Sequence, residues 1–210
     1  MLFALLIACS SPAPSSPAAP GLAAAPGGIP APSVDVYGLA MGAATAGEIE
    51  AWLSARKLSC TQGPSVRRTT FRYDCAGDLP VDTLPGPRRG RLTNLLVVRG
   101  DTTPMSHLST IRKYSLPADA VADYAEALAA LTGRLGAPTR AATTPDASQL
   151  DGVAAHWATS WAFTNLAVRL VLLKAGSATI TLSETWDLPG AEEHEDTRPA
   201  SGVNPSSPHP

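Results

Sequence analysis

The chain has 210 residues, which is room for one ordinary domain or two very small ones. Sixteen lysine and arginine residues stand against eighteen aspartate and glutamate residues, and the region 34–188 is close to neutral, with fifteen basic and fourteen acidic residues. Proteins that bind nucleic acids usually carry a strong basic excess, so this composition argues against a nucleic-acid partner.

The chain opens on an apolar run, residues 1–8, that leads directly to Cys9. Eight residues are too few to span a bilayer as a helix, which needs about 20, but an apolar run that ends in small residues is typical of a secretory signal. Leu6-Ile7-Ala8-Cys9 resembles the lipobox of bacterial lipoproteins. This resemblance implies that residues 1–8 are a signal peptide and that Cys9 carries the lipid. A buried N-terminal strand is the alternative.

Ser10 to Ser33 is a tract of seven prolines, seven alanines, five serines and three glycines besides two apolar residues. It has too little apolar surface to offset the entropy lost on ordering, so we expect it to stay unfolded. A Pro-rich chain extends by about 3.1 Å per residue, which gives this tract a reach of roughly 75 Å. Residues 9–33 are therefore predicted to tether a domain to the membrane. By the same resemblance, Ser10 after the cysteine implies the outer membrane.

Hydrophobic periodicity is confined to residues 34–188, which we predict to form a single domain. A domain of this length buries about 70% of the surface that its unfolded chain exposes, which is enough for a core. Residues 189–210 are mostly proline, glycine, serine and acidic residues. We predict that they form a disordered polar tail.

The first predicted helix covers residues 46–58. Thr45 and Glu48 form a capping box, in which the two side chains satisfy free backbone amides at a helix start. The apolar residues that share one helical face are Ile49, Trp52 and Leu53. The basic pair at 56–57 suits the negative end of the helix dipole.

Cys60 and Cys75 lie inside the predicted domain, and export would place them in an oxidising compartment. They flank a predicted turn at residues 61–65 and the alternating run at residues 66–74 that follows it. A bridge would close a loop of about 15 residues and contribute roughly 3 kcal/mol in the chain-entropy model. Zinc is disfavoured, because the spacing is not that of a close pair and no nearby histidine or cysteine completes four ligands. We predict a disulfide, with two free thiols as the alternative.

After the first helix the hydrophobic period changes to two. Residues 67–75 alternate, residues 92–99 are almost continuously apolar, as in a strand covered on both faces, and residues 105–114 alternate again. We predict three antiparallel strands, with a long loop of proline, glycine and arginine at residues 76–91 between the first two.

The second predicted helix ends at Leu135. Its apolar stripe consists of Val121, Tyr124, Leu128, Leu131 and Leu135. Asp119 and Asp123 stand in its first turns, Gly136 is placed for a left-handed C-cap, and Pro138 prevents continuation.

A polar loop, residues 139–152, leads to three more alternating strands. Their apolar faces are Trp157, Trp161 and Phe163; Val168, Leu170 and Leu172; and Ala178, Ile180, Leu182 and Trp186. The three tryptophans predict either an exposed aromatic platform or, as is more common, core beneath a helix.

The element order is thus αβββ-αβββ. It predicts an α+β fold of two layers, an antiparallel sheet with two helices on one face, and a second face that is wet or bound to a partner. The first helix, Leu135-Gly136-Ala137-Pro138 at the second helix end and the following meander resemble two families. These are the small lipoprotein of the outer-membrane β-barrel assembly machinery and the tandem-repeat β-lactamase inhibitor proteins. The resemblance implies helices packed on a sheet and function through protein–protein contact.

Arg88, Arg89 and Arg91 make one loop the densest positive site in the sequence. Such a loop could contact acidic lipid headgroups, lipopolysaccharide phosphates or an acidic partner. The alternative is a solvated loop, because charge runs usually face water.

No motif carries recognisable chemistry. His107 and His156 lie in predicted strands near Ser106 and Ser160, but the fixed context of a nucleophile elbow is missing, so we expect solvent-facing or hydrogen-bonded histidines. There is no glycine-rich phosphate loop and no set of metal ligands, so we expect neither a cofactor nor a metal.

We therefore expect a non-enzymatic, lipid-anchored protein of the cell envelope that acts as a protein-interaction or scaffold module. The alternative is an inhibitor-like module that binds an exported enzyme through its open sheet face. A less favoured alternative is an envelope hydrolase that uses His107 or His156.

Overall fold

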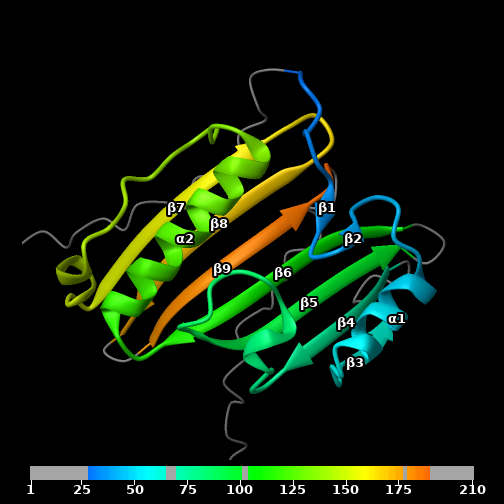
Figure 1. Ribbon diagram of the computed structural model, residues 1–210, viewed down its shortest axis with the longest axis horizontal. Helices are drawn as coiled ribbons and strands as arrows, with labels where there is room; N and C mark the ends of the chain where they lie inside the picture. The colour runs from blue at the N-terminus through cyan, green and yellow to red at the C-terminus, as the bar shows by residue number, and fades with distance from the viewer. Residues whose placement is uncertain (1–27, 65–69, 101–103, 177–178, 190–210) are drawn as a thin grey trace, which may run out of the picture.

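The computed structural model describes residues 28–64, 70–100, 104–176 and 179–189. Its centre is a seven-stranded sheet in which every neighbouring pair of strands is antiparallel (Figure 1). The strand order is β3-β4-β5-β6-β9-β8-β7. The strands are β3 Thr61–Pro64, β4 Thr70–Ala76, β5 Arg91–Gly100, β6 Met105–Tyr114, β7 Ala154–Ala162, β8 Ala167–Ala175 and β9 Thr179–Asp187.

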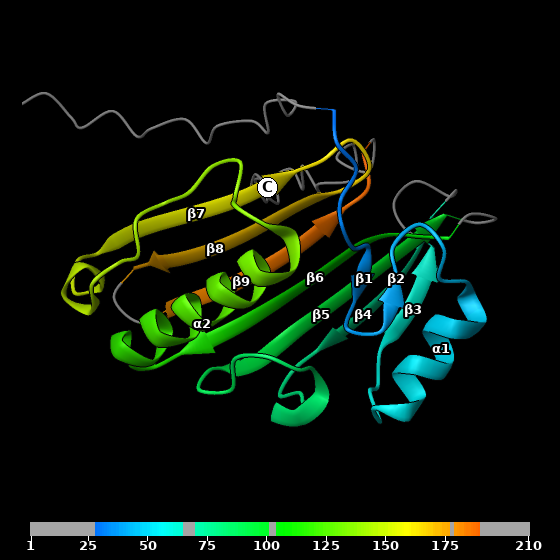
Figure 2. The same ribbon diagram turned by 45° about the horizontal axis from the view of Figure 1, so that its top comes forward.

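Two helices lie on one face of this sheet, which we name the inner face; the other is the open face. Helix α1 (Ala46–Ala55) lies at the β3–β4 side and α2 (Pro117–Leu135) lies across β8 and β9 (Figure 2). Two 3-10 turns, η1 (Val81–Thr83) and η2 (Ala147–Leu150), interrupt the loops. The predicted α+β fold with two helices on one face is confirmed.

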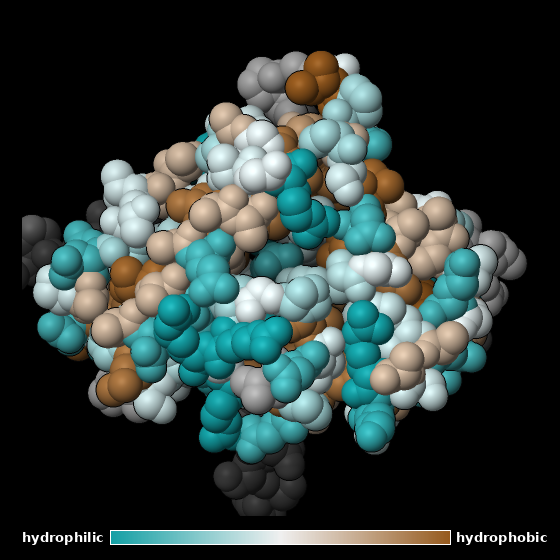
Figure 3. Space-filling view, viewed as in Figure 1, coloured by the Kyte–Doolittle hydropathy of each residue, from teal (hydrophilic) through white to brown (hydrophobic). Residues whose placement is uncertain are grey.

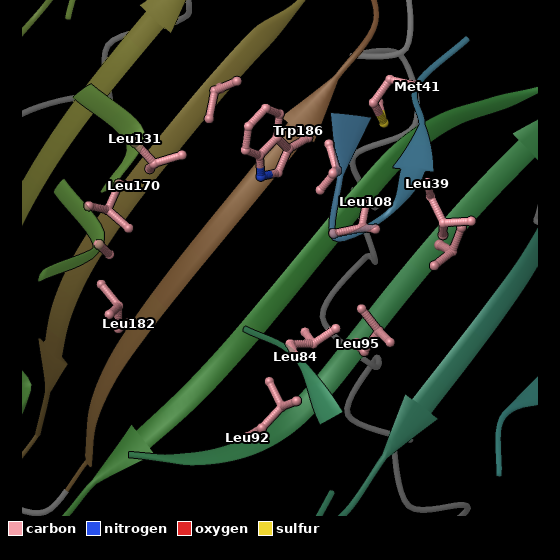
Figure 4. Packing of buried hydrophobic residues seen from close by; sticks show 14 of the residues in the cluster. Leu39, Met41, Leu84, Leu92, Leu95, Leu108, Leu131, Leu170, Leu182 and Trp186 are labelled. Carbon is pink, nitrogen blue, oxygen red and sulfur yellow. The ribbon is translucent and has the colours of Figure 1, made fainter. Parts of the chain in front are cut away.

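Alternation along the strands directs large apolar side chains to the inner face (Figure 4). Under α2, Leu131 of the helix packs near Leu170 and Leu182 of the sheet. On the other side, the apolar residues come from the loop before β5, from β5 itself and from the N-terminal segment, and they include Leu39, Leu84, Leu92 and Leu95. The two groups meet at the cross-strand pair of Leu108 and Trp186.

The first half of the chain contributes four strands to the sheet, so the predicted αβββ-αβββ order is wrong by one strand. The extra strand, β3, covers most of the predicted turn at 61–65 and pairs with β4. Gly63 and Pro64 disfavour a central strand, because proline has no N–H to donate to a neighbouring strand. Strand β3 is at the sheet edge, where one side of the strand has no neighbour and the missing N–H leaves no carbonyl unpaired. The first residues of the strand predicted at 67–75 and Ala178 of the last predicted strand lie outside the described residues.

Helix α1 begins at the predicted capping box: the Thr45 hydroxyl accepts from the Glu48 amide, and the Glu48 carboxylate accepts from the Thr45 amide. It ends three residues before the predicted end at 58. Lys57 takes a left-handed conformation with φ of 54°, and the Leu58 amide donates to the Leu53 carbonyl. This is the Schellman geometry, which closes the helix before the basic pair can extend it. Helix α2 ends as predicted, with Gly136 at φ of 84°.

A short hairpin before α1 was not predicted. Strands β1 (Asp35–Val36) and β2 (Leu39–Ala40) are joined by Tyr37 and Gly38, which both have positive φ, as in a type I′ turn. The Tyr37 carbonyl accepts from the indole of Trp52 at 2.9 Å and from Arg56 at 3.3 Å. These two bonds hold the hairpin against α1.

The segment after α2 runs along the outer edge of β7. The amide of Arg140 donates to the Ser160 carbonyl at 3.1 Å, and the Ser160 amide donates back at 2.8 Å. Side-chain hydroxyls complete the contact, because Thr139 accepts from Ala162 and Thr159 accepts from the Ala142 amide. The edge strand β7 is therefore partly occupied by its own chain.

Candidate functional site

The structure joins Cys60 and Cys75 in a disulfide, which confirms that prediction. The β3–β4 register pairs Thr61 with Asp74, so the two cysteines lie side by side at the open end of a hairpin. Cys75 is fully buried against the inner-face core. The predicted lipid attachment site, Cys9, lies outside the described residues.

Of the three predicted loop arginines, Arg89 has a structural role. Its Nη1 donates to the Asp123 carboxylate at 2.7 Å and to Glu126 at 3.0 Å. The backbone amides of Arg89 and Gly90 also donate to Asp123, and so does the Tyr114 hydroxyl. The sequence placed Asp123 in the first turns of α2 as a helix-start acid. In the structure Asp123 is fully buried, and its hydrogen bonds fix this loop to the helix.

Arg88 and Arg91 are each paired with a carboxylate of their own domain. Arg88 contacts Asp82 at 3.0 Å, with both side chains largely exposed, and Arg91 contacts Asp78. Arg91 also lines an open hollow of about 550 Å³ together with Lys113. The predicted anion contact by this loop stays a prediction, and the internal carboxylates offset much of its charge.

The tryptophans of the second half form core instead of a platform. Trp161 and Trp186 are fully buried on the inner face, and Trp157 is half-buried. The Trp161 indole donates to the Gly136 carbonyl at the end of α2, at 2.9 Å. Of the two alternatives, the structure supports core beneath a helix.

His107 lies on the open face and takes part in a chain of hydrogen bonds. Its Nδ1 is 2.5 Å from the Asp187 carboxylate, on the neighbouring strand β9, and its Nε2 is 3.1 Å from the Ser109 hydroxyl. The serine is thus Ser109, two residues along the same strand, and not the adjacent Ser106 named above. His156 is exposed on β7 and pairs with Leu173.

A polar strip crosses the inner face between its two apolar groups. It is formed by Thr110 and Arg112 of β6 and Glu184 of β9, with Tyr37 of the hairpin above them. Thr110 and Glu184 are direct cross-strand partners. The Glu184 carboxylate accepts from the Trp186 indole at 2.6 Å, and the Tyr37 hydroxyl is in hydrogen-bonding contact with Glu184 and Thr110. We name these four residues the polar strip.

The environment shifts two acids of the polar strip. Burial raises the pKa of the Glu184 carboxyl, although hydrogen bonds from Trp186 and Tyr37 and the charges of Arg134 and Arg112 act against it. Burial and the adjacent Glu184 carboxyl raise the pKa of the Tyr37 phenol well above its ordinary value. Ionisable groups with shifted pKa values are common at functional sites, so the polar strip is a candidate site.

The sequence did contain a signal for the polar strip. Thr110 and Arg112 fall in the same alternation phase as the buried Leu108 and Tyr114, and Glu184 falls in phase between Leu182 and Trp186. A charged residue in the buried phase of a strand needs a partner or a ligand. Tyr37 carried no comparable signal, because it reaches the strip through a hairpin of two-residue strands.

Comparisons with known proteins identify no relative. No family model matches the chain, and neither a curated protein nor a solved structure resembles it significantly. In the part of the chain that the structure describes, no helix is long and apolar enough to cross a membrane. Over the same residues, no three side chains of histidine, cysteine, aspartate or glutamate gather as metal ligands would.

Proposed function

We propose that the chain is a non-enzymatic, lipid-anchored protein of the cell envelope that binds a protein partner with the open face of its sheet. The location rests on the lipobox resemblance at Cys9 and on the proline-rich tract that follows it. The binding role rests on one feature of the open face: the middle of this face is a patch that contains no charged side chain.

This patch spans the middle of the open face. Cross-strand pairing aligns Ile111, Ser183, Val171 and Ala158 in one row across four strands. Thr181 and Leu173 form the adjoining pair, and Leu173 is 38% exposed. We name these six residues the uncharged patch.

Ionisable side chains border the uncharged patch. Lys113 and His156 lie at the two ends of the row that contains Thr181 and Leu173. Arg169 lies in the next row on the other side of the patch. The pair of His107 and Asp187 follows one row further. Protein interfaces commonly have a centre depleted of charge and a polar rim, so this arrangement supports partner binding.

The binding role is tested by placing an arginine in the patch. Ser183→Arg should abolish capture of the partner from envelope extract by the full-length chain, since it puts an unpaired charge into the centre of the contact. The matched control is Ala129→Arg, which adds the same side chain at an exposed position of α2. Equal capture by both variants would contradict the proposal. A captured enzyme that loses activity would establish the inhibitor-like form of the same function.

The anchor is tested separately by metabolic labelling with palmitate. We expect label on the wild-type chain and none on Cys9→Ala. An unlabelled wild-type chain would remove the proposed anchor while leaving partner binding untouched.

One observation favours a second function, hydrolysis at Ser109. Asp187, His107 and Ser109 are linked by hydrogen bonds in the order of an orienting carboxylate, a base and a nucleophile. In such a reaction the Ser109 oxygen attacks an acyl carbon, its proton passes to His107 Nε2, and the leaving group departs with that proton. Water then attacks the acyl-enzyme, His107 takes a proton from this water and returns it to the Ser109 oxygen, and the acid is released. Against it, Ser109 is in a central strand, where backbone amides serve the sheet ladder instead of an oxyanion hole.

A fluorophosphonate probe decides between the two functions. Labelling of the full-length chain that disappears in Ser109→Ala and in His107→Ala would establish the hydrolase. We expect no labelling above that of Ser109→Ala, which is the result that a binding protein gives.

A further inference from the structure

An open hollow of about 550 Å³ lies where β4 and β6 end and where β5 and β9 begin. Its lining includes two basic side chains, Arg91 and Lys113, and one acidic side chain, Asp78. All three residues are exposed to solvent. We name this space the corner hollow. Because it is open to solvent and carries more positive than negative charge, an anion can enter it and is attracted to it.

The two basic residues of the corner hollow face each other across two strands. Arg91 and Lys113 are direct partners in the register of β5 and β6. The Cβ atoms of such partners are about 5 Å apart, and like charges in this relation destabilise a sheet. Asp78 forms an ion pair with Arg91, whereas Lys113 has no ion pair among the described residues. The positive charge of Lys113 is therefore left without a counter-charge from the domain.

The corner hollow also contains hydrogen-bond donors that no described residue uses. Arg91 donates to Asp78 through Nη2, which leaves its Nε and Nη1 groups available. Ser115 and Thr179 line the same space, and their hydroxyls have no hydrogen-bond partner among the residues that the structure describes. Hydroxyl, guanidinium and ammonium donors around one open space suit an anion that presents several oxygens.

The other two arginines of the arginine-rich loop are engaged elsewhere. Arg88 and Arg89 are absent from the described lining of the corner hollow, and both are paired with carboxylates. Figure 3 shows hydrophilic side chains gathered on the helix side of the sheet, over this loop and the adjoining part of α2. The cations that remain for an anion are thus Arg91 and Lys113, a lysine outside the arginine run.

We propose that the corner hollow binds a phosphate group, with Lys113 and Arg91 as its cations and the hydroxyls of Ser115 and Thr179 as further donors. The oxygens of a phosphate point in several directions, so the group can accept from both cations at once and offset their repulsion. A carboxylate has only two oxygens in one plane and would use fewer of these donors. The volume is in the range of small-molecule sites, which leaves room for an organic group that carries the phosphate.

The inference does not rest on the proposed function. Partner binding is assigned to the uncharged patch, which adjoins the corner hollow at the cross-strand pair of Lys113 and Thr181. Phosphate binding is measured with small probes in the absence of any partner protein, so either proposal can fail while the other stands.

The phosphate is either free in solution or part of a lipid headgroup, and two probes distinguish these sources. The full-length chain carrying Cys9→Ser, so that no lipid is attached, is titrated with sodium phosphate at constant ionic strength. The backbone amide resonances of Gly77 and Ser115 report binding, because both residues line the corner hollow. In the second arm, the same chain is floated with vesicles of phosphatidylcholine that contain phosphatidylglycerol. Sodium acetate is the control anion.

We expect saturable binding of at least one probe. Binding of free phosphate without flotation identifies a soluble ligand, and flotation identifies a lipid headgroup. Lys113→Gln should weaken the binding about tenfold, which corresponds to the loss of one charged contact. Lys113→Arg keeps the charge and should restore most of it. Lys113→Gln should also fold, because the side chain is exposed and the substitution separates two like charges.

The matched control is Arg140→Gln. It removes the same charge from an exposed position beside β7, outside the described lining of the corner hollow, and should change binding less than about twofold. The proposal is overturned if neither probe binds saturably or if Lys113→Gln binds as tightly as the parent chain. It is equally overturned if Arg140→Gln weakens binding as much as Lys113→Gln, since the attraction would then belong to the whole surface. Acetate that binds as tightly as phosphate would overturn the assignment to phosphate.

Discussion

Asp123 and Arg112 are both charged residues buried on the inner face, but their surroundings differ. Asp123 is fully buried and accepts from two backbone amides, a tyrosine hydroxyl and a guanidinium. Arg112 is almost as deeply buried and keeps an Nη1 without a partner. Breaking a completely paired buried charge destabilises the fold strongly because its partners are left unpaired, whereas a buried charge with incomplete pairing already costs stability.

The largest effect is expected at the fully paired site. Asp123→Ala should lower the free energy of unfolding by about 3–5 kcal/mol, because it leaves several donors without an acceptor. Urea unfolding measures this change. Glu126→Ala is the matched control, since Glu126 contacts the same Arg89 Nη1 but is 52% exposed, and its loss should cost less than about 1 kcal/mol. Equal losses would show that Asp123 is not the centre of this network.

The next largest effect concerns Gly90, whose amide donates to Asp123. A Cβ atom at this position would lie 2.3 Å from Cζ of Tyr114 and would displace the ring that also binds Asp123. Gly90→Ala should therefore lower the unfolding free energy by about 1–3 kcal/mol. Gly133→Ala in α2 meets no atom within 4 Å and should raise it by about 0.5–1 kcal/mol. The same urea series compares the two; a neutral Gly90→Ala would contradict the tight packing.

At Arg112, the incompletely paired residue, we expect a substitution to raise the free energy of unfolding instead of lowering it. Arg112→Met removes a buried charge that lacks a full set of acceptors, so the unfolding free energy should rise by about 1 kcal/mol. Arg169→Met on the open face should change it by no more than about 0.5 kcal/mol. A loss of stability in Arg112→Met would mean that Arg112 is fully paired in the folded protein and would weaken the comparison with Asp123.

The smallest effect is a dependence on pH. Because the pKa of Glu184 is raised above its ordinary value of 4.5, the unfolded chain releases this proton at a lower pH than the folded chain. Stability from this group is therefore present below about pH 4 and falls as pH rises through the folded pKa. The charges facing Glu184 are those of Arg112 and Arg134, which limit the fall. Glu184→Gln should flatten the change in urea midpoint between about pH 4 and about pH 7, and an unchanged slope would assign it to other groups.

The fold was predictable where the hydrophobic period was long. Strand β6 matches its predicted bounds, and α2 ends where Gly136 and Pro138 require it. Strand β3 was missed because Gly63 and Pro64 indicate a turn, and only its position at the sheet edge makes a strand possible. The β1–β2 hairpin was missed because strands of two residues contain no period.

The candidate site was less predictable, because a sequence shows charges without their partners. Arg88, Arg89 and Arg91 were conspicuous as a run, yet each is paired inside the domain. Arg112 was marked in the sequence only by its place in the buried phase of β6, because its incomplete pairing depends on neighbours that the sequence does not show. The disulfide was predictable from two cysteines beside an alternating run, since the hairpin between them is local in sequence.

The segment between α2 and β7, which pairs with the outer edge of β7, affects how copies of the chain behave when they are crowded together. An open edge strand is a template on which another chain can continue the sheet, and this is a common route to aggregation. The proposed lipid at Cys9 would bring copies of this chain together at a high local concentration in two dimensions. By hydrogen-bonding Ser160 to its own Arg140, the chain closes part of that route, and neighbouring copies can crowd together without fusing their sheets on that side.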